Sequence, residues 1–154
     1  MPTTHIREER PDSADALQLL SELDEQLNAM PYPPESRHAF SVEKLIHQQV
    51  AFFVTQQDGA PAGCGGVMVV GTEYGEVKRM YVRPQFRGTG LGKLMLEHLA
   101  GYARQRGVRL LRLETGVYQP EAIGLYERAG FQRIPPFGDY REDPMSIYFE
   151  KRIA

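Results

Sequence analysis

Residues 77–93 read Val-Lys-Arg-Met-Tyr-Val-Arg-Pro-Gln-Phe-Arg-Gly-Thr-Gly-Leu-Gly-Lys, and this stretch decides the fold. A strand runs into a loop with glycines at positions 88, 90 and 92, and the apolar spacing that follows predicts an amphipathic helix over 90–106. The first N–H groups of a helix have no partner inside it, and the helix dipole is positive at that end. Because glycines let several N–H groups turn toward one point, we predict a site for a diphosphate-bearing cofactor, with Arg87 and Lys93 adding positive charge.

Two better-known phosphate-binding motifs do not fit these glycines. A P-loop needs Gly-x-x-x-x-Gly-Lys-Ser/Thr, which the sequence lacks. A dinucleotide-binding fold needs Gly-x-Gly-x-x-Gly early in a repeating βαβ pattern, whereas the spacing here is Gly-x-Gly-x-Gly in mid-chain. A nucleotide-binding module therefore fails on motif grounds.

Hydrophobic periodicity extends this unit in both directions. The elements expected before it are a strand at 3–8, a helix starting at Asp12 or Ser13 and ending near Asn28, a helix at 36–48 that turns Phe40, Leu45 and Ile46 inward, and strands at 51–56, 64–70 and 73–82. After the long helix we expect a strand at 108–115, a helix at 120–129 and strands at 131–134 and 145–151. Antiparallel hairpins followed by a β-α-β-α-β order predict a three-layer α/β domain with a mixed sheet, formed by residues 1–154.

Composition limits the classes of partner. The chain has 154 residues and a net charge of −2, so it has no basic field for nucleic acid or an anionic membrane. Its one cysteine, Cys64, excludes an internal disulfide and a C-x-x-C metal site, and its position in a strand predicts an inert, packed thiol. The N-terminus is polar and no apolar run approaches the length of a membrane span, so we expect a cytoplasmic protein.

The glycine loop also carries a family resemblance. Gln85-x-x-Gly88-x-Gly90, which also reads Arg87-x-x-Gly90-x-Gly92, resembles the acyl-CoA pyrophosphate loop of the GNAT superfamily of N-acetyltransferases. This loop is one of two cofactor motifs of that family. Together the two motifs cover roughly residues 76–134 of this sequence, in the order and at the separation found in the family.

Neighbouring segments extend the resemblance. Residues 79–84, Arg-Met-Tyr-Val-Arg-Pro, resemble the family's fourth strand, and residues 113–131 resemble its second cofactor motif, a strand and short helix ending in Tyr-Glu-x-x-Gly-Phe. The ends, residues 33–38 and 135–144, look like one bacterial subgroup of the family, which names no substrate.

The resemblance implies a fold and a cofactor. The fold is of the GNAT type, with a mixed central sheet whose fourth and fifth strands splay apart between flanking helices. Acetyl-CoA is the implied cosubstrate, without a metal, and its pantetheine arm would fill the gap between the splayed strands. The implied contacts come from the main chain of Met80, Tyr81 and Val82, from the pyrophosphate loop Arg87, Gly88, Thr89, Gly90, Leu91, Gly92 and Lys93, and from Gln119, which stands where many members have asparagine.

Acetyl transfer to an amine requires a proton acceptor and a proton donor. The resemblance implies that Tyr126 protonates the departing CoA thiolate; alternatively it only packs in the core. It also implies that Glu76 is the base. Strand alternation puts Glu76 and Met80 on one face of the strand and Arg79 on the other face. The alternatives are a surface glutamate paired with Lys78, or proton removal through ordered water.

Three residues are candidates for binding the acceptor amine. Glu114 stands in an otherwise apolar strand and could bind an ammonium group or act as base; alternatively it forms a salt bridge with Arg112 or Arg79. His38 and Tyr140 would line the pocket from two sides.

The implied function is acetyl-CoA-dependent N-acetylation of the primary amine of a small molecule, by direct transfer in a ternary complex. A protein or peptide N-acetyltransferase and a non-catalytic acyl-CoA sensor are the alternatives, and the acceptor and acyl length stay open. Homodimerisation is a candidate assembly, with the strand at 145–151 as the candidate edge.

Overall fold

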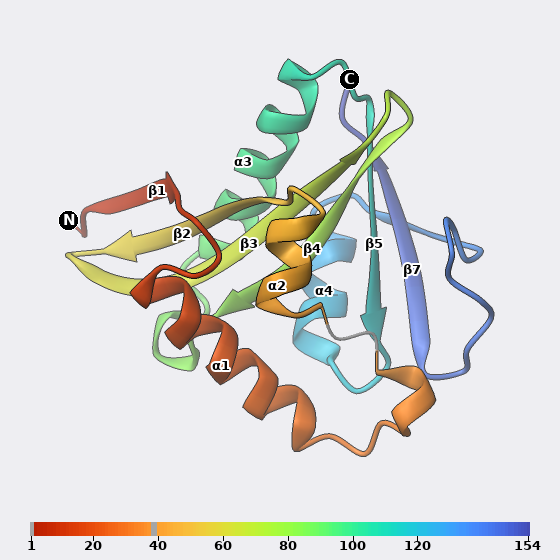
Figure 1. Ribbon diagram of the computed structural model, residues 1–154, viewed down its shortest axis with the longest axis horizontal. Helices are drawn as coiled ribbons and strands as arrows, with labels where there is room; N and C mark the ends of the chain where they lie inside the picture. The colour runs from red at the N-terminus through yellow and green to blue at the C-terminus, as the bar shows by residue number, and fades with distance from the viewer. Residues whose placement is uncertain (1, 38–39) are drawn as a thin grey trace.

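A computed structural model describes residues 2–37 and 40–154. In this part of the chain a seven-stranded sheet has the order β1-β2-β3-β4-β5-β7-β6 (Figure 1). The strands are β1 (Thr4–Glu8), β2 (Ala51–Gln57), β3 (Ala60–Val70), β4 (Tyr74–Val82), β5 (Leu110–Gly116), β6 (Gln132–Ile134) and β7 (Ser146–Arg152). The helices are α1 (Ala14–Asn28), α2 (Val42–His47), α3 (Leu91–Gln105) and α4 (Pro120–Arg128), with short 3-10 turns η1 (Pro34–Ser36) and η2 (Pro84–Phe86).

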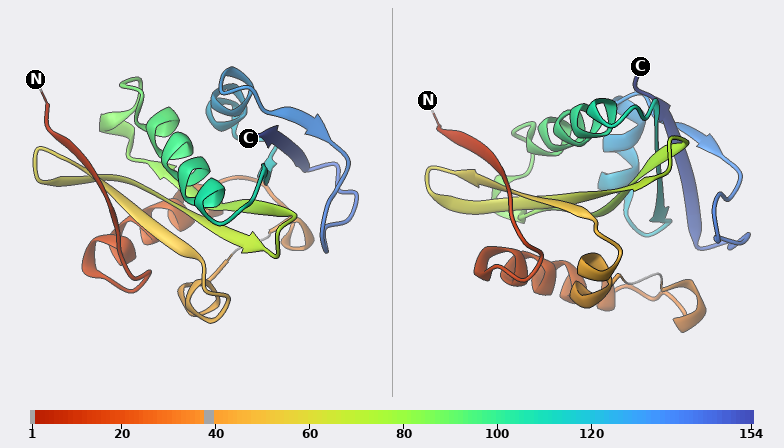
Figure 2. Two further views of the ribbon diagram at one scale, coloured as in Figure 1. Left: turned by 90° about the horizontal axis from the view of Figure 1, so that it is seen from above. Right: turned by 45° about the horizontal axis from the view of Figure 1, so that its top comes forward.

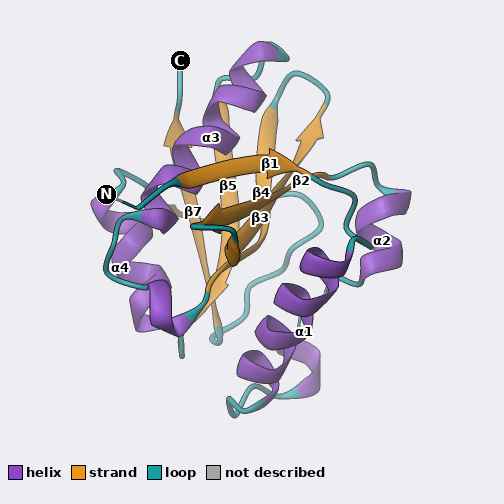
Figure 3. Ribbon diagram, turned by 90° about the vertical axis from the view of Figure 1, so that its left-hand side faces the viewer, coloured by secondary structure: helices purple, strands orange, loops and turns teal. Residues whose placement is uncertain are grey.

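The molecule has three layers, as the sequence predicts. Helices α1 and α2 cover one face of the sheet, while α3 and α4 cover the other (Figures 2 and 3). One apolar cluster joins α3 and α4 to the sheet, and a second joins α1 and α2 to its opposite face. Every strand pair is antiparallel except β4 with β5, so the expected mixed α/β sheet is confirmed.

Local signals set the helix ends. The hydroxyl of Ser13 accepts a hydrogen bond from the Ala16 N–H and caps α1. Ser41 caps α2 in the same way, so the predicted helix over 36–48 is wrong in its start and length. Leu45 is fully buried, but Ile46 is exposed, contrary to expectation.

Strands β4 and β5 separate soon after they meet. Their parallel pairing consists of Gly75 with Leu111 and Glu76 with Arg112. Beyond these pairs the two strands diverge toward the ends where α3 and α4 begin (Figure 1). The predicted splay is therefore present, and main-chain groups of β4 after Glu76 have no strand partner on that side within the described chain.

A bulge in β4 changes which way its side chains point. Arg79 and Met80 together lie opposite the single residue Gly65, and Arg79 adopts a φ of 55°. Strict alternation places Met80 with Glu76 and puts Arg79 on the opposite face, and this assignment is wrong. Met80 packs with the α3 cluster, while Arg79 reaches Asp24 of α1, because an extra residue reverses the alternation.

The C-terminal strand lies inside the sheet. β7 pairs with β5 on one side and with β6 on the other, so the expectation that residues 145–151 form a sheet edge is wrong. The chain after α4 supplies the short outer strand β6. In the described ranges no helix is long and apolar enough to cross a membrane.

Candidate active site

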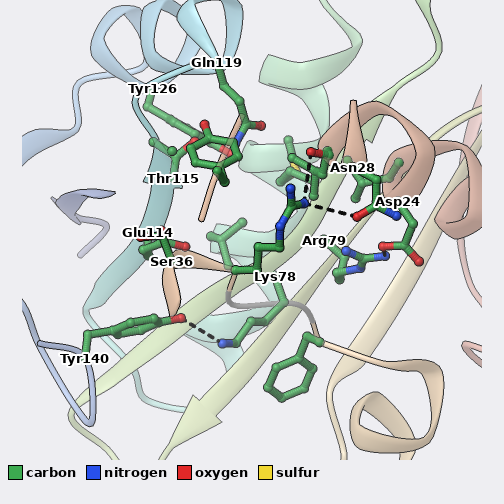
Figure 4. Close-up of a pocket in the computed structure, with 18 residues that line it drawn as sticks. Asp24, Asn28, Ser36, Lys78, Arg79, Glu114, Thr115, Gln119, Tyr126 and Tyr140 are labelled. Carbon is green, nitrogen blue, oxygen red and sulfur yellow. Dashed lines mark hydrogen bonds and ion pairs between the residues drawn. The ribbon is translucent and has the colours of Figure 1, made fainter. Parts of the chain in front are cut away.

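A cavity of about 170 Å³ opens at the splay between β4 and β5 (Figure 4). Apolar and aromatic side chains form much of its wall: Leu23, Leu27, Tyr32, Phe40, Val77, Met80 and Tyr126. The polar or charged lining residues are Asp24, Asn28, Ser36, Arg37, Lys78, Arg79, Glu114, Thr115, Gln119 and Tyr140, with Gly116 between them. Five of the predicted site residues thus meet in one cavity, namely Met80, Glu114, Gln119, Tyr126 and Tyr140.

Glu76 lies just behind the wall of this cavity and is held by two lining residues. Tyr140 donates a hydrogen bond to Glu76 Oε2 at 2.6 Å, and Lys78 Nζ lies 2.7 Å from the same oxygen. Lys78 Nζ also donates to the Tyr140 hydroxyl at 3.1 Å. The pairing of Glu76 with Lys78 is therefore present, but Glu76 is 4% exposed and is not a surface residue.

The environment of Tyr140 keeps its hydroxyl protonated. Burial raises the pKa of Tyr140, and the neighbouring carboxylate of Glu76 raises it further. A neutral hydroxyl can donate to Glu76 while its oxygen accepts from another group. Glu76, Tyr140 and Lys78 therefore form a hydrogen-bonded group that connects a buried carboxylate to the cavity.

Tyr126 belongs both to the core and to the cavity. Its ring lies 5.8 Å from Phe131 and 6.0 Å from Phe149, measured between centroids, and the residue is buried. Burial, followed by the nearby charge of Glu114, raises the pKa of Tyr126. The hydroxyl is therefore a proton donor at neutral pH, and core packing and a place at the cavity are compatible.

Glu114 contacts the cavity from β5. Ser146 Oγ of β7 donates a hydrogen bond to Glu114 Oε2 at 2.8 Å. The alternative salt bridges are wrong, because Arg112 pairs with Glu150 and Arg79 pairs with Asp24.

Two segments far apart in sequence close one side of the cavity. Ser36 of η1 donates to Asp143 Oδ1 at 3.0 Å, and Ser36 is buried. Near the end of β5, the Tyr32 hydroxyl accepts from the Tyr118 N–H at 2.9 Å and lies directly over Gly116. Ser36 and Tyr32 were not predicted as wall residues, because the only local signal in this region is the proline-rich break beside them. His38 lies outside the described residues.

The glycine loop before α3, residues 88–93, has the backbone geometry expected of an anion cradle. Gly88 and Gly90 have φ values of 78° and 87°, and Gly90 is the N-cap of α3 without a side-chain cap. Within the described chain, no backbone carbonyl accepts a hydrogen bond from the six N–H groups of residues 88–93. Consecutive unpartnered N–H groups at a helix N-terminus fit a diphosphate.

Other residues predicted to bind the cofactor have different contacts. Arg87 donates to the Val82 carbonyl at 2.8 Å, to Gln26 at 2.7 Å and to Glu121 at 3.2 Å, so its side chain ties β4 to α1 and α4. A Cβ at position 92 would lie 2.8 Å from the Leu125 side chain. Gly92 therefore allows α3 to pack closely on α4.

Two further predicted contacts also lie away from the cavity. The Tyr81 side chain points to α1 and donates to Glu22, which leaves only its main chain for a cofactor. Lys93 lines a second cavity, between α3 and β7.

Cys64 is buried in β3, as predicted, and burial raises the pKa of its thiol to about 12. Since the thiolate is the reactive form, we expect Cys64 not to react with Ellman's reagent at neutral pH while the protein is folded. Titration in buffer and in guanidinium chloride tests this, with one reactive thiol expected only after unfolding. Rapid labelling of the folded protein would contradict the closed packing around β3.

In residues 2–37 and 40–154 no group of three or more His, Cys, Asp or Glu side chains could hold a metal ion. The polar groups at the cavity can donate and accept protons without one. The arrangement therefore combines an anion cradle, a gap between strands, a buried hydroxyl donor and a buried carboxylate.

Comparisons with known proteins agree with this arrangement. A family model described as the acetyltransferase (GNAT) family matches residues 17–131. The IAA acetyltransferase of Azospirillum brasilense is 42% identical over 99% of this chain and 100% of its own length. A crystal structure from Klebsiella pneumoniae, described provisionally as an acyl-CoA N-acyltransferase, superposes with a TM-score of 0.83 at 33% identity over 99% of both chains.

A more distant structure holds the cofactor. PaiA N-acetyltransferase from Thermoplasma acidophilum, solved in complex with coenzyme A, has a TM-score of 0.77 at 20% identity, over 97% of this chain and 99% of that one. This fold is thus seen with coenzyme A bound.

Proposed function

Because the chain belongs to the acetyltransferase (GNAT) family, whose members carry out acetyl-CoA-dependent acetylation, we propose that it acetylates the primary amine of a small molecule by direct transfer in a ternary complex. The observation that supports a small-molecule acceptor is that one wall of the cavity is closed. The Ser36–Asp143 hydrogen bond joins η1 to the loop 135–145, and Tyr32 covers Gly116. A compact amine fits a cavity of about 170 Å³ better than a continuous polypeptide does.

The cofactor supplies an activated acetyl thioester, and the chain supplies binding and proton transfer. The N–H groups of residues 88–93 would hold the diphosphate. The main chain of β4 from Met80 on, which has no strand partner on the β5 side within the described chain, would hold the pantetheine arm. Gln119 would contact the same arm from the start of α4. A backbone N–H at the splay would polarise the thioester oxygen.

Three side chains would handle protons. Tyr126 gives its hydroxyl proton to the CoA sulfur as the C–S bond breaks and the C–N bond forms. Tyr140 relays the proton that the amine loses to Glu76. The Tyr140 oxygen accepts the proton of the amine while the Tyr140 hydroxyl proton moves to Glu76. Glu114 would attract the ammonium form of the acceptor from the opposite strand.

The experiment that tests this function is release of free CoA thiol from acetyl-CoA by the purified protein. The acceptor panel contains amino acids, polyamines, aminoglycosides and short peptides, together with IAA because the Azospirillum brasilense relative carries that name. Turnover with a small amine supports the proposal. Turnover confined to peptides favours a peptide N-acetyltransferase, and tight acetyl-CoA binding without any turnover favours a sensor. A cytoplasmic location and a homodimer stay predictions.

Replacing Gly90 with alanine tests the anion cradle. A side chain at φ 87° costs about 1–2 kcal/mol, so we expect the loop to move and the Kd for acetyl-CoA to rise roughly tenfold by calorimetry. Gly59→Ala is the matched control, because Gly59 has a φ of 82° in the β2–β3 turn, far from the cavity, and its Cβ would also meet open space. Equal affinities in the two variants would contradict the assignment of the loop.

A further inference from the structure

Arg79 is a buried arginine whose side chain is only partly satisfied. It lines the cavity from the bulge of β4, and 7% of its side chain is exposed. Its Nη2 donates to Asp24 Oδ1 at 2.6 Å and to the Leu20 carbonyl at 3.4 Å. Its Nε, which is fully buried, has no hydrogen-bond partner among the described residues. A buried N–H without an acceptor costs stability, and more so when the group is charged.

Arg83, the residue that follows β4, shows that an arginine in this region can have a hydrogen-bond partner for each of its three nitrogens. It lies four residues further along the same chain and also pairs with a carboxylate of α1. Its Nε and Nη2 donate to Glu22 at 2.9 and 2.6 Å, and its Nη1 donates to the Pro61 carbonyl at 3.1 Å. Arg83 does not line the cavity. The unsatisfied arginine is thus the one at the cavity, and it occupies a backbone conformation that only glycine adopts without cost.

Charges near Arg79 favour an anionic ligand for its Nε–H. Arg37, which lines the same side, donates to the Leu27 and Met30 carbonyls and to the Asn28 amide oxygen, all neutral groups. Arg37 and Arg79 carry two positive charges here against the single carboxylate of Asp24, which pairs with Arg79 at 2.6 Å. The α1 side of the cavity therefore has an excess of positive charge. A guanidinium N–H binds a carboxylate more strongly than it binds a neutral carbonyl.

The opposite side of the cavity carries negative charge. Glu114 lies on β5 across the cavity from Arg79, with Tyr140 nearer to Glu114 (Figure 4). The Lys78 ammonium on this side is balanced by Glu76, whose Oε2 lies 2.7 Å away. A ligand with an ammonium group and a carboxylate would match both sides.

We propose that the acceptor is an amino acid or a related amine carrying a carboxylate, and that the Arg79 side chain turns so that its Nε–H, which has no acceptor in this conformation, binds this carboxylate and sets the specificity. This inference rests on the proposed function and names the substrate class of the same site. The amine then faces Glu114 and Tyr140, where its proton is removed, while the carboxylate lies toward α1.

The test compares acceptors that differ only in the carboxylate. Phenylalanine is set against 2-phenylethylamine and phenylalanine amide, and leucine against isopentylamine. For the wild type we expect kcat/KM to favour each acid over its amine by about tenfold to a hundredfold, the value of one charge-assisted hydrogen bond. Arg79→Lys keeps the charge but removes the Nε–H, and we expect it to lose most of this preference with the KM for acetyl-CoA unchanged.

Arg83→Lys is the matched control, since it weakens an equivalent pair between β4 and α1 outside the cavity; it should keep the preference. Thermal melting of both variants reports folding. Equal use of acids and amines by the wild type would overturn the inference while leaving the proposed function intact. A raised KM for acetyl-CoA in Arg79→Lys would also overturn it, because the ligand of Nε would then be the cofactor.

Binding separates the two proposals. If no acceptor is turned over, the proposed function fails, and calorimetry of each acid and amine with the CoA complex still decides the inference. The inference is supported if the wild type binds the acids more tightly than the amines and Arg79→Lys loses this preference. It is contradicted if the wild type shows no such preference.

Discussion

Replacing Tyr126 with phenylalanine is expected to lower kcat by about a hundredfold or more, which is the usual contribution of a general acid. Burial together with Glu114 raises the pKa of the Tyr126 hydroxyl, so it stays protonated over the working pH range and holds the proton that the CoA sulfur needs as the C–S bond breaks. Phenylalanine keeps the ring contacts with Phe131 and Phe149, so the fold and the KM for acetyl-CoA should change little. Steady-state release of CoA thiol measures the effect.

Tyr102→Phe is the control for Tyr126→Phe. Tyr102 lies on α3 and packs against the same apolar cluster, but it does not line the cavity. We expect wild-type kcat in this variant. If Tyr126→Phe also retained wild-type kcat, the proton would reach the thiolate from another donor, and Tyr126 would only be a core residue.

Replacing Phe149 with alanine is expected to destabilise the protein by about 3–5 kcal/mol, the cost of emptying a fully buried aromatic site. Phe149 is 0% exposed, at the centre of β7, and it pairs with Leu113 of β5 and Arg133 of β6. Unfolding in urea measures the loss of free energy. Because the Phe149 ring also supports Tyr126, we expect kcat to fall as well in the fraction that remains folded.

Phe149→Leu separates volume loss from strand position. It keeps much of the apolar volume, so it should cost clearly less than Phe149→Ala. A loss below about 1 kcal/mol for alanine would be typical of a surface position and would contradict the interior place of β7.

Local patterns predicted the parts of this protein that depend on neighbouring residues. The helix spacing of 90–106, the Ser13 cap and the strands on each side of Asp58-Gly59 were readable, because each needs contacts only a few residues away. The strand–glycine loop–helix unit also predicted a diphosphate site, because the expected unpartnered N–H groups depend only on the backbone around Gly90 and the helix start.

Distant contacts were not readable in the same way. Ser36 meets Asp143 across 107 residues, and Glu114 meets Ser146 across 32. Such pairs depend on which strands become neighbours and in what register, and any of several oppositely charged or hydrogen-bonding residues satisfies the local pattern. Glu114 was therefore assigned to Arg112 or Arg79 as an alternative, while the sheet order gives both arginines other partners.

The sequence by itself indicated the family, through the resemblance of residues 76–134 to its motifs, and the three-layer fold, through hydrophobic periodicity. The glycines at the helix start also predicted an anion site, and their backbone geometry fits that prediction. Only the tertiary structure decided where Arg79 points and that β7 lies inside the sheet. One extra residue in β4 reverses the alternation of its side chains, and strand order depends on long-range packing. Both are properties of the assembled sheet, and they place the polar groups that surround the cavity.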